Sequence, residues 1–528
     1  MKKKLHILTT CLILLLINCR EEDLSQQENP VASTQRASKV TSGIYESEMP
    51  YNLNVVYFIP SDVSARPDYE RRVSETLLHA QEYYRQMMYN WGYGNRTFGL
   101  LKNPATNRIK INIINGALPI SSYPYSSGNQ ILSEVNAWFA NHPADKTSDH
   151  NVIITATPSI NTEIPYYGLG RNFFVGDNED SDVQYFNENS ARGNQAKAYM
   201  GGFLHELGHG LGLPHDALAK SLTNVAGYGT SLMSWGNQTY GYSSTILTKA
   251  SCAILNNTQL FSTIAKPTGY FYTGSNGFKI TSINHSYING RINIWGTYSV
   301  DAPINAINSY FIPKDSYYHA VSGSSNTDGT NTFSTYVDVS DLYFTEKTYS
   351  LVLQAQFVNG NSNWVTFPFT FKNDIPDLNF PVNKDNWTVS SSSQYAAYPS
   401  SLAIDDNINT YWHTNYSAGS VQTDPIAGQP QNFPYYFDIN MGAIKGISGL
   451  SFTQHQGLVR TAKTTVIYTR ATTNDGWKHQ GTFNLTNTID KQYTAFAQKE
   501  NCRYVRIVFY SSHDAQPYIA MPEIGAYE

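Results

Sequence analysis

Cysteine is scarce in this chain of 528 residues, which contains four: Cys11, Cys19, Cys252 and Cys502. The first two lie in an apolar leader, and we expect the last two to belong to different domains. A secreted fold held by disulfides needs an even set of closely spaced cysteines. We therefore exclude a disulfide framework and expect hydrophobic cores to hold the fold.

Charge is also low, because charged residues make up 15% of the chain and the formal net charge is −5. Binding to nucleic acid requires clustered positive charge, so we exclude nucleic acid as a partner. Aromatic residues are abundant instead, with 39 Tyr, 24 Phe and 8 Trp. This excess suits β-strand packing and sugar-stacking loops. The length exceeds what a single core supports and predicts about three domains.

Long hydrophobic runs are absent except at the amino terminus, where three lysines precede an apolar segment. This segment is typical of a secretory signal and is too short for a stable membrane anchor. The sequence LINC that ends at Cys19 resembles a bacterial lipobox. We expect a lipoprotein signal peptide at 1–18, lipidation of Cys19 and a flexible polar tether at 19–48. The protein would then be an outer-membrane lipoprotein at the cell surface, with a cleaved signal and a secreted protein as the alternative.

The sequence HELGHGLGLPHD, which begins at His205, is the central motif of the chain. His205 and His209 are four residues apart and project from one face of a helix. Gly212 can adopt a left-handed conformation that ends the helix, so that His215 can turn back as a third ligand. Three imidazoles leave the fourth position of a tetrahedral zinc for water, the layout of a catalytic site. Glu206 is then placed as the general base.

This motif resembles the zinc signature of the metzincin metallopeptidases, and Asp216 after the third histidine is most similar to the reprolysin (adamalysin-like) branch. The clan carries a methionine turn beneath the metal, and Met233 in SLMSW is the candidate, with an ordinary core methionine as the alternative. The resemblance implies a zinc endopeptidase in which Glu206 is the general base on a zinc-bound water. Asp216 would orient the loop that carries His215.

The segment 49–264 is predicted to form this peptidase domain, with an α/β architecture. Expected elements are a strand at 53–59, a long helix ending near Trp91, a half-buried strand at 109–113, a helix at 129–139, a strand at 152–154, an edge strand within 166–175, the zinc helix and a closing helix at 244–260. An extended peptide could pair with the edge strand.

The segment 265–375 alternates strand-like runs with polar turns and has no helical period. This pattern predicts an immunoglobulin-like β-sandwich. We interpret it as a spacer or packing partner, because nothing in its sequence supports a binding role.

The segment 376–528 resembles the discoidin, or coagulation-factor type C, domain, a β-sandwich (jelly roll) shared with family-32 carbohydrate-binding modules. The resemblance rests on AIDDNINTYWH from Ala403, YYFD from Tyr435, DGW from Asp475, RYVR from Arg503 and a terminal Glu523-Ile524. It implies glycan binding by His455 and Arg460, and a calcium ion held by Asp405, Thr410 and Glu523. A purely structural module is the alternative, and we expect Trp412 and Trp477 to be core residues.

Together these features predict a monomeric, surface-anchored zinc endopeptidase that hydrolyses host glycoproteins of the mucin type and holds them through a carboxy-terminal glycan-binding module. The alternative is a non-catalytic glycan-binding adhesin with a retired protease domain. Zinc content distinguishes the two hypotheses.

Overall fold

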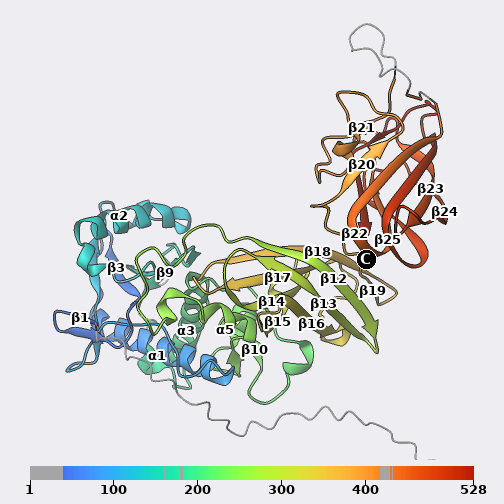
Figure 1. Cartoon of the computed structure of the whole chain (residues 1–528). Helices are drawn as coiled ribbons and strands as arrows, with labels where there is room; N and C mark the ends of the chain where they lie inside the picture. The colour runs from blue at the N-terminus through green and yellow to red at the C-terminus, as the bar shows by residue number, and fades with distance from the viewer. Residues whose placement is uncertain (1–39, 160–161, 179–181, 417–428, 431) are drawn as a thin grey trace, which may run out of the picture.

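The computed structural model describes residues 40–159, 162–178, 182–416, 429–430 and 432–528 (Figure 1). The predicted signal peptide, Cys19 and most of the predicted tether lie outside these residues. The end of the tether was predicted wrongly, because β1 (Val40–Ser42) and β2 (Tyr45–Ser47) form an antiparallel hairpin. Gly43 allows the turn with a φ of 61°, a conformation that costs glycine little. Among the described residues, no helix combines the length and apolarity that crossing a bilayer requires.

The first domain is built on a five-stranded sheet in the order β6-β3-β7-β9-β8. The strands are β3 (Asn54–Ile59), β6 (Asn112–Asn115), β7 (Asn151–Ala156), β8 (Tyr167–Leu169) and β9 (Asn172–Asp177). All pairs are parallel except β8 with β9, so the edge strand β8 runs against its neighbour. The short strands of this domain are β4 (Lys102–Asn103), β5 (Arg108–Ile109), β10 (Thr230–Ser231) and β11 (Thr245–Ile246).

Helices cover both faces of this sheet (Figure 1). They are α1 (Tyr69–Asn90), α2 (Gly128–Asn141), α3 (Ala191–Gly210), the single turn α4 (Asn237–Thr239) and α5 (Lys249–Leu255). Ile131, Val135 and Phe139 of α2 form one core with one face of the sheet. The helices α1 and α3 share a larger core with the other face. The sheet therefore presents its edge strand β8 beside α3.

Two predicted elements of this domain differ in the structure. The alternation at 109–113 does not form one strand, because Ile109 is buried in β5 whereas Ile113 is 46% exposed and Ile114 is buried in β6. The closing helix is shorter than predicted: α5 has seven residues and buries Cys252. Residues on either side of α5 pair with β10 or form a separate 3-10 turn instead.

The middle domain is a sandwich of two antiparallel sheets. The smaller sheet has the order β12-β13-β16 and the larger β15-β14-β17-β18-β19. Their bounds are β12 (Phe278–Ile288), β13 (Arg291–Val300), β14 (Ile304–Pro313), β15 (Val321–Asn326), β16 (Thr332–Asp338), β17 (Tyr349–Phe357), β18 (Ser362–Lys372) and β19 (Ile375–Asp377). Side chains from both inner faces fill one core, as alternation along the strands requires.

The carboxy-terminal domain is a second β-sandwich, attached at the far end of the middle domain (Figure 1). Its main sheet runs β20-β22-β25-β23-β24, with β27 paired to β22, and a small sheet pairs β21 with β26. The bounds are β20 (Thr388–Ser391), β21 (Trp412–His413), β22 (Tyr435–Thr453), β23 (Ala462–Arg470), β24 (Lys478–Asn484), β25 (Gln492–Ser512), β26 (Ala520–Met521) and β27 (Glu523–Tyr527). The protein is thus a β-rich multidomain chain.

The two tryptophans predicted for this core differ in environment. Trp412 is fully buried in the core. Trp477 is only half-buried, and the guanidinium groups of Arg470 and Arg506 lie 4.4 and 4.8 Å from its ring. Stacking on two cations, rather than core packing, therefore holds Trp477.

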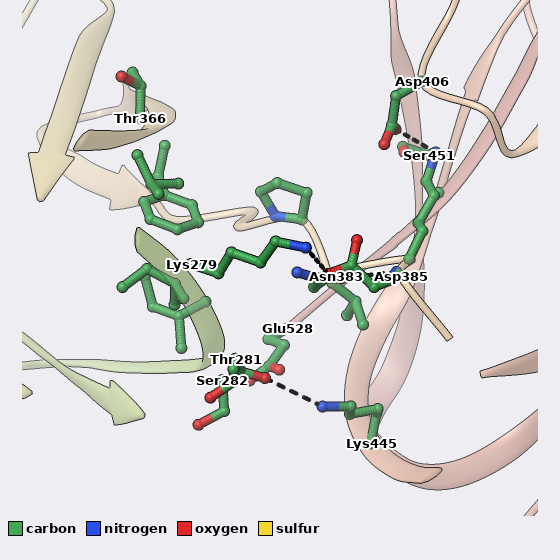
Figure 2. Close-up of a pocket in the computed structure, with 18 of the residues that line it drawn as sticks. Lys279, Thr281, Ser282, Thr366, Asn383, Asp385, Asp406, Lys445, Ser451 and Glu528 are labelled. Carbon is green, nitrogen blue, oxygen red and sulfur yellow. Dashed lines mark hydrogen bonds and ion pairs between the residues drawn. The ribbon is translucent and has the colours of Figure 1, made fainter. Parts of the chain in front are cut away.

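A cleft lined by both polar and apolar side chains lies between the middle and carboxy-terminal domains (Figure 2). It has a volume of about 310 Å³. Lys279 and Asp385 form an ion pair of 2.8 Å across it, and Lys445 Nζ lies 3.4 Å from the carbonyl oxygen of Thr281. These contacts are mostly exposed and contribute little each.

Candidate metal centre

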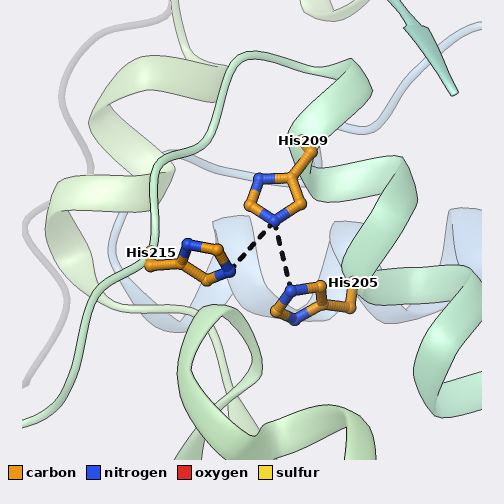
Figure 3. Close-up of side chains that lie close together, drawn as sticks. All are labelled: His205, His209 and His215. Atoms are coloured by element: carbon orange, nitrogen blue, oxygen red, sulfur yellow. Dashed lines mark hydrogen bonds between the residues drawn. The ribbon is translucent and has the colours of Figure 1, made fainter. Parts of the chain in front are cut away.

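The helix α3 positions two of the three histidines of the central motif. Ser190 begins it as an N-cap whose hydroxyl accepts a hydrogen bond from the Gly193 amide, a preferred way to satisfy a helix amino terminus. The helix ends at Gly210, and Gly212 has a φ of 90°. This left-handed residue reverses the chain as the sequence predicts, and His215 returns toward α3 from the following loop (Figure 3).

The three imidazoles converge on one point. The Nε2 atom of His209 lies 3.2 Å from that of His205 and 3.3 Å from that of His215. The Nδ1 atoms of His205 and His209 lie 2.7 and 2.9 Å from the carbonyl oxygens of Leu232 and Leu213. Because a carbonyl only accepts, both Nδ1 atoms carry the proton, and the lone pairs of Nε2 face each other.

Facing lone pairs repel each other unless a cation lies between them. Two nitrogens bound to one tetrahedral zinc ion at about 2.0–2.1 Å are about 3.3 Å apart, which matches the two separations that involve His209. The ligand nitrogens of all three histidines lie within 4.8 Å of one another. Burial also lowers the pKa of His205 to about 4 and that of His215 to about 3. All three rings are therefore neutral at physiological pH, the form that binds a metal. The residues present fit a zinc ion.

Glu206 lies beside this point and faces the edge strand. Its Oε2 atom accepts a hydrogen bond of 3.0 Å from the amide of Gly168 in β8. Burial raises the pKa of Glu206 to about 7, and the Gly168 hydrogen bond opposes part of that rise. A carboxyl group with a pKa near neutrality can both accept and release a proton.

The loop around Met233 lies beneath α3. The carbonyl of Leu232 accepts the hydrogen bond from His205, and Met233 is fully buried. A Cβ atom added to Gly208 would meet the Met233 sulfur at 2.5 Å. A glycine at this position therefore lets the methionine pack directly against the turn of α3 between the two helical histidines.

Asp216 is fully buried and joins its own loop to three other segments. Hydroxyl groups of Ser231, Thr248, Ser251 and Ser322 donate hydrogen bonds to its carboxylate. Ser231 precedes the methionine loop. Thr248 and Ser251 lie at the start of α5, and Ser322 belongs to β15 of the middle domain. Asp216 thus fixes the loop that carries His215, as the sequence analysis expected of it.

The middle domain forms part of the wall of this site, so of the two interpretations, spacer or packing partner, the structure supports the packing partner. The ring of Tyr318 lies 4.2 Å from that of His215 and is stacked 4.8 Å from that of Trp235. The amide of Ala217 donates to the carbonyl of Ala320 at 2.7 Å. Sequence reasoning missed Tyr318, because no local motif marks it and its partners lie about a hundred residues earlier.

The cavity above the histidines has a volume of about 630 Å³ and is shared by both domains. The first domain contributes Tyr125, Tyr167, Gly168, Glu206 and the three histidines, and the middle domain contributes Tyr318, Gln354, Ser362 and Trp364. Apart from the histidines, Glu206 is the only acidic or basic residue among the described residues that line it. Beyond the three histidines and Glu206, the described lining of the cavity therefore carries no ionisable side chain except the tyrosines.

The two predicted glycan-binding residues of the carboxy-terminal domain lie on the loop between β22 and β23. His455 and Arg460 both contribute to lowering the pKa of His413, after the larger effect of burial. The His455 ring contacts the edge of Tyr411 at 4.7 Å, and Arg460 is paired with Asp514 at 2.6 Å. His413 and Tyr411 were within a quoted motif but were not recognised as part of this cluster.

The predicted calcium ligands do not face a common point. Thr410 donates a hydrogen bond of 2.7 Å to Asp405, whereas Glu523 is paired with the ammonium group of Lys384, which also contacts Asp406 at 2.8 Å. The cation beside Glu523 is therefore a side chain of the protein. Calcium binding here stays a prediction that requires Lys384 to move.

Comparisons with known proteins agree with this division of the chain. The F5/8 type C domain family matches residues 388–524. Galactose oxidase of Gibberella zeae is 26% identical over 151 residues, which cover 28% of this chain and 20% of the relative. The sialidase of Micromonospora viridifaciens is 29% identical over 127 residues, 24% of this chain and 18% of the relative. This chain spans about a fifth of the length of these curated relatives.

Crystal structures of OgpA from Akkermansia muciniphila resemble a larger share of the chain. A catalytically inactive OgpA in complex with an O-glycopeptide substrate is 33% identical, with a TM-score of 0.57, and the match covers 61% of this chain and 94% of OgpA. Wild-type OgpA gives 34% identity and the same TM-score and coverage. At this identity and coverage, the chain belongs to the same family as OgpA.

Proposed function

We propose that this chain is a zinc endopeptidase of the metzincin type that hydrolyses peptide bonds in O-glycosylated proteins. The observation that carries the proposal is the convergence of one ring nitrogen from each of three imidazoles, all within 4.8 Å of one another, beside Glu206. Membership of the OgpA family supports the substrate class, because an OgpA structure contains an O-glycopeptide substrate. The resemblance to metzincins rests on the motif and on Met233 beneath it.

The residues of the site divide the chemistry among them. His205, His209 and His215 would hold the zinc ion, which supplies Lewis acidity toward the peptide carbonyl and toward water. Glu206 Oε2 is engaged by Gly168, so we assign proton transfer to Oε1. That oxygen takes a proton from the attacking water and delivers it to the departing amine.

The edge strand β8 orients the substrate. It has one neighbour, β9, and its other edge lies beside α3 and the cavity. The amide of Gly168 on this edge already donates to Glu206, so an extended peptide would pair with the remaining main-chain groups of the edge. Substrate that pairs with β8 lies between Glu206 and the histidines on one side and the middle domain on the other.

The carboxy-terminal domain would hold the glycosylated substrate. Its family match and the cluster of His413, His455 and Arg460 support glycan binding there. Lipidation of Cys19 and display on the cell surface are part of the same proposal and follow from the leader sequence.

The test is cleavage of an O-glycosylated protein by three chains: wild type, Glu206→Gln and the exposed control Glu82→Gln. New amino termini are identified by mass spectrometry, with and without a zinc chelator. We expect the wild type and the control to cleave at glycosylated segments, and the chelator and Glu206→Gln to abolish cleavage. Equal cleavage by Glu206→Gln would overturn the assignment of the base, and no cleavage by the wild type would favour the adhesin.

A further inference from the structure

We propose that Trp364, with Gln354 and Ser362, forms a sugar-binding subsite on the middle domain, which contacts an uncharged saccharide carried by the substrate. The inference rests on the proposed function and deepens it. Trp364 is 60% exposed and lines the same cavity as His205 and Glu206. A single exposed indole is common on a protein surface, but Trp364 lines a concave cavity together with Glu206, where aromatic side chains commonly contact ligands.

The strand β18 presents Trp364 outward. Phe367 and Phe369 of the same strand are buried in the sandwich core, and Trp364 has the opposite parity from both. Alternation along a strand therefore directs Trp364 away from the core. Its cross-strand partner is Gln354 of β17, so an aromatic ring and an amide lie side by side on the outer face of the sheet.

Polar groups around Trp364 are held in place. The hydroxyl of the buried Tyr310 donates to Gln354 Oε1 at 3.1 Å, and Gln354 Nε2 donates to Ser362 Oγ at 3.3 Å. This chain of hydrogen bonds fixes the orientation of the amide. The Ser362 hydroxyl keeps its own proton for a further acceptor.

This combination suits a neutral sugar. A pyranose ring has an apolar face of C–H groups that packs on an aromatic ring, and hydroxyls at its rim that pair with amides and hydroxyls. The middle-domain residues that line the cavity carry no formal charge, so an ionic ligand finds no partner there. The sugar is either the outer unit of the glycan at the cleaved site or a glycan on a flanking residue, and both offer the same chemistry.

The test compares steady-state cleavage of two synthetic glycopeptides, one with a single uncharged disaccharide and one with a second glycosylated residue. The variants are Trp364→Ala, Trp364→Phe and the control Trp295→Ala, which removes an indole that is 43% exposed on the other sheet of the same domain. We expect Trp364→Ala to raise KM by about tenfold. The change should appear in KM rather than in kcat. The KM of Trp364→Phe should stay close to that of the wild type.

The two substrates distinguish the sources of the sugar. An increase in KM for both peptides places the outer unit of the single glycan on Trp364, and an increase only for the doubly glycosylated peptide places the flanking glycan there. Unchanged KM for both peptides would overturn the subsite.

A binding measurement decides the same question without turnover. Calorimetry with the doubly glycosylated peptide uses the full chain with Glu206→Gln and His455→Ala, with or without Trp364→Ala. We expect Trp364→Ala to weaken the Kd by about tenfold, and an equal Kd would refute the subsite. Failure of the wild type to cleave either peptide refutes the proposed function alone, because the calorimetric comparison still tests the subsite.

Discussion

The three histidines on and after α3 and the acidic loop of the carboxy-terminal domain were both predicted to bind a cation. In the structure they differ in whether a cationic side chain lies beside the predicted ligands. At α3, three imidazole nitrogens lie close together, and no cationic side chain is among the described residues that line their cavity. In the carboxy-terminal loop, Lys384 supplies an ammonium group to Glu523 and Asp406. The comparison shows that a ligand pattern in sequence is not by itself evidence for a metal, because a cationic side chain of the same chain can pair with the carboxylates instead.

The largest loss of peptide cleavage is expected from a substitution on α3. Replacing His209 by Ala removes the nitrogen that lies closest to both others. We expect peptide cleavage to fall by more than about a hundredfold, because loss of an outer partner of a metal ligand already costs up to that amount. Cleavage of an O-glycopeptide followed by mass spectrometry measures it. His142→Ala, an exposed histidine on the same domain, is the control, and equal activity of the two variants would contradict the account.

A large loss of stability is expected from Asp216→Ala. The change removes a buried acceptor and leaves four hydroxyl groups without their shared partner. We expect the free energy of unfolding of the first domain to fall by about 3 kcal/mol, measured by chemical denaturation. Ser322→Ala, which removes a single donor, should cost about 1 kcal/mol. If both variants unfold like the wild type, Asp216 does not hold the His215 loop.

A smaller effect on catalysis is expected from Tyr318→Ala. The ring of Tyr318 supports His215 and stacks on Trp235, so its loss frees the third ligand. We expect kcat/KM to fall by about tenfold, with Tyr318→Phe close to wild type because the ring contacts remain. If the phenylalanine variant is as impaired as the alanine variant, the hydroxyl rather than the ring is the important group.

The smallest effect is expected on thermal stability, from a substitution beside the acidic loop of the carboxy-terminal domain. Because Lys384 already neutralises Glu523, we expect calcium to leave the Tm of the wild type unchanged. Lys384→Met leaves Glu523 buried without its partner and should cost about 1–3 kcal/mol, which added calcium should restore. Thermal unfolding with calcium or a calcium chelator checks both statements. A rise in the Tm of the wild type with calcium would show that Lys384 gives way to the ion.

Much of the metal centre could be predicted because its geometry is local. The spacing of His205 and His209 follows from helical periodicity, and Gly212 carries the reversal within a few residues. The buried face of α1 repeats at helical spacing, and β3 and β7 are short continuous apolar runs buried on both faces, as parallel strands between helices usually are, so all three could be predicted. Features that depend only on spacing within one element could therefore be predicted from the sequence.

Other parts depend on contacts between distant segments. Lys384 meets Glu523 across 139 positions, and Tyr318 reaches His215 from another domain. Ile113 fits an alternating pattern, yet the chain changes phase between β5 and β6 and exposes it. Periodicity carries no information about such partners or phase changes, so these features required the structure.

The metal content of the purified full chain tests the central claim most directly. After dialysis, elemental analysis of the wild type, Glu206→Gln and His209→Ala reports the zinc bound per chain. We predict one zinc per chain in the wild type and in Glu206→Gln, and a loss of most of it in His209→Ala. A wild type without stoichiometric zinc, or a His209→Ala chain that retains it, would contradict the account.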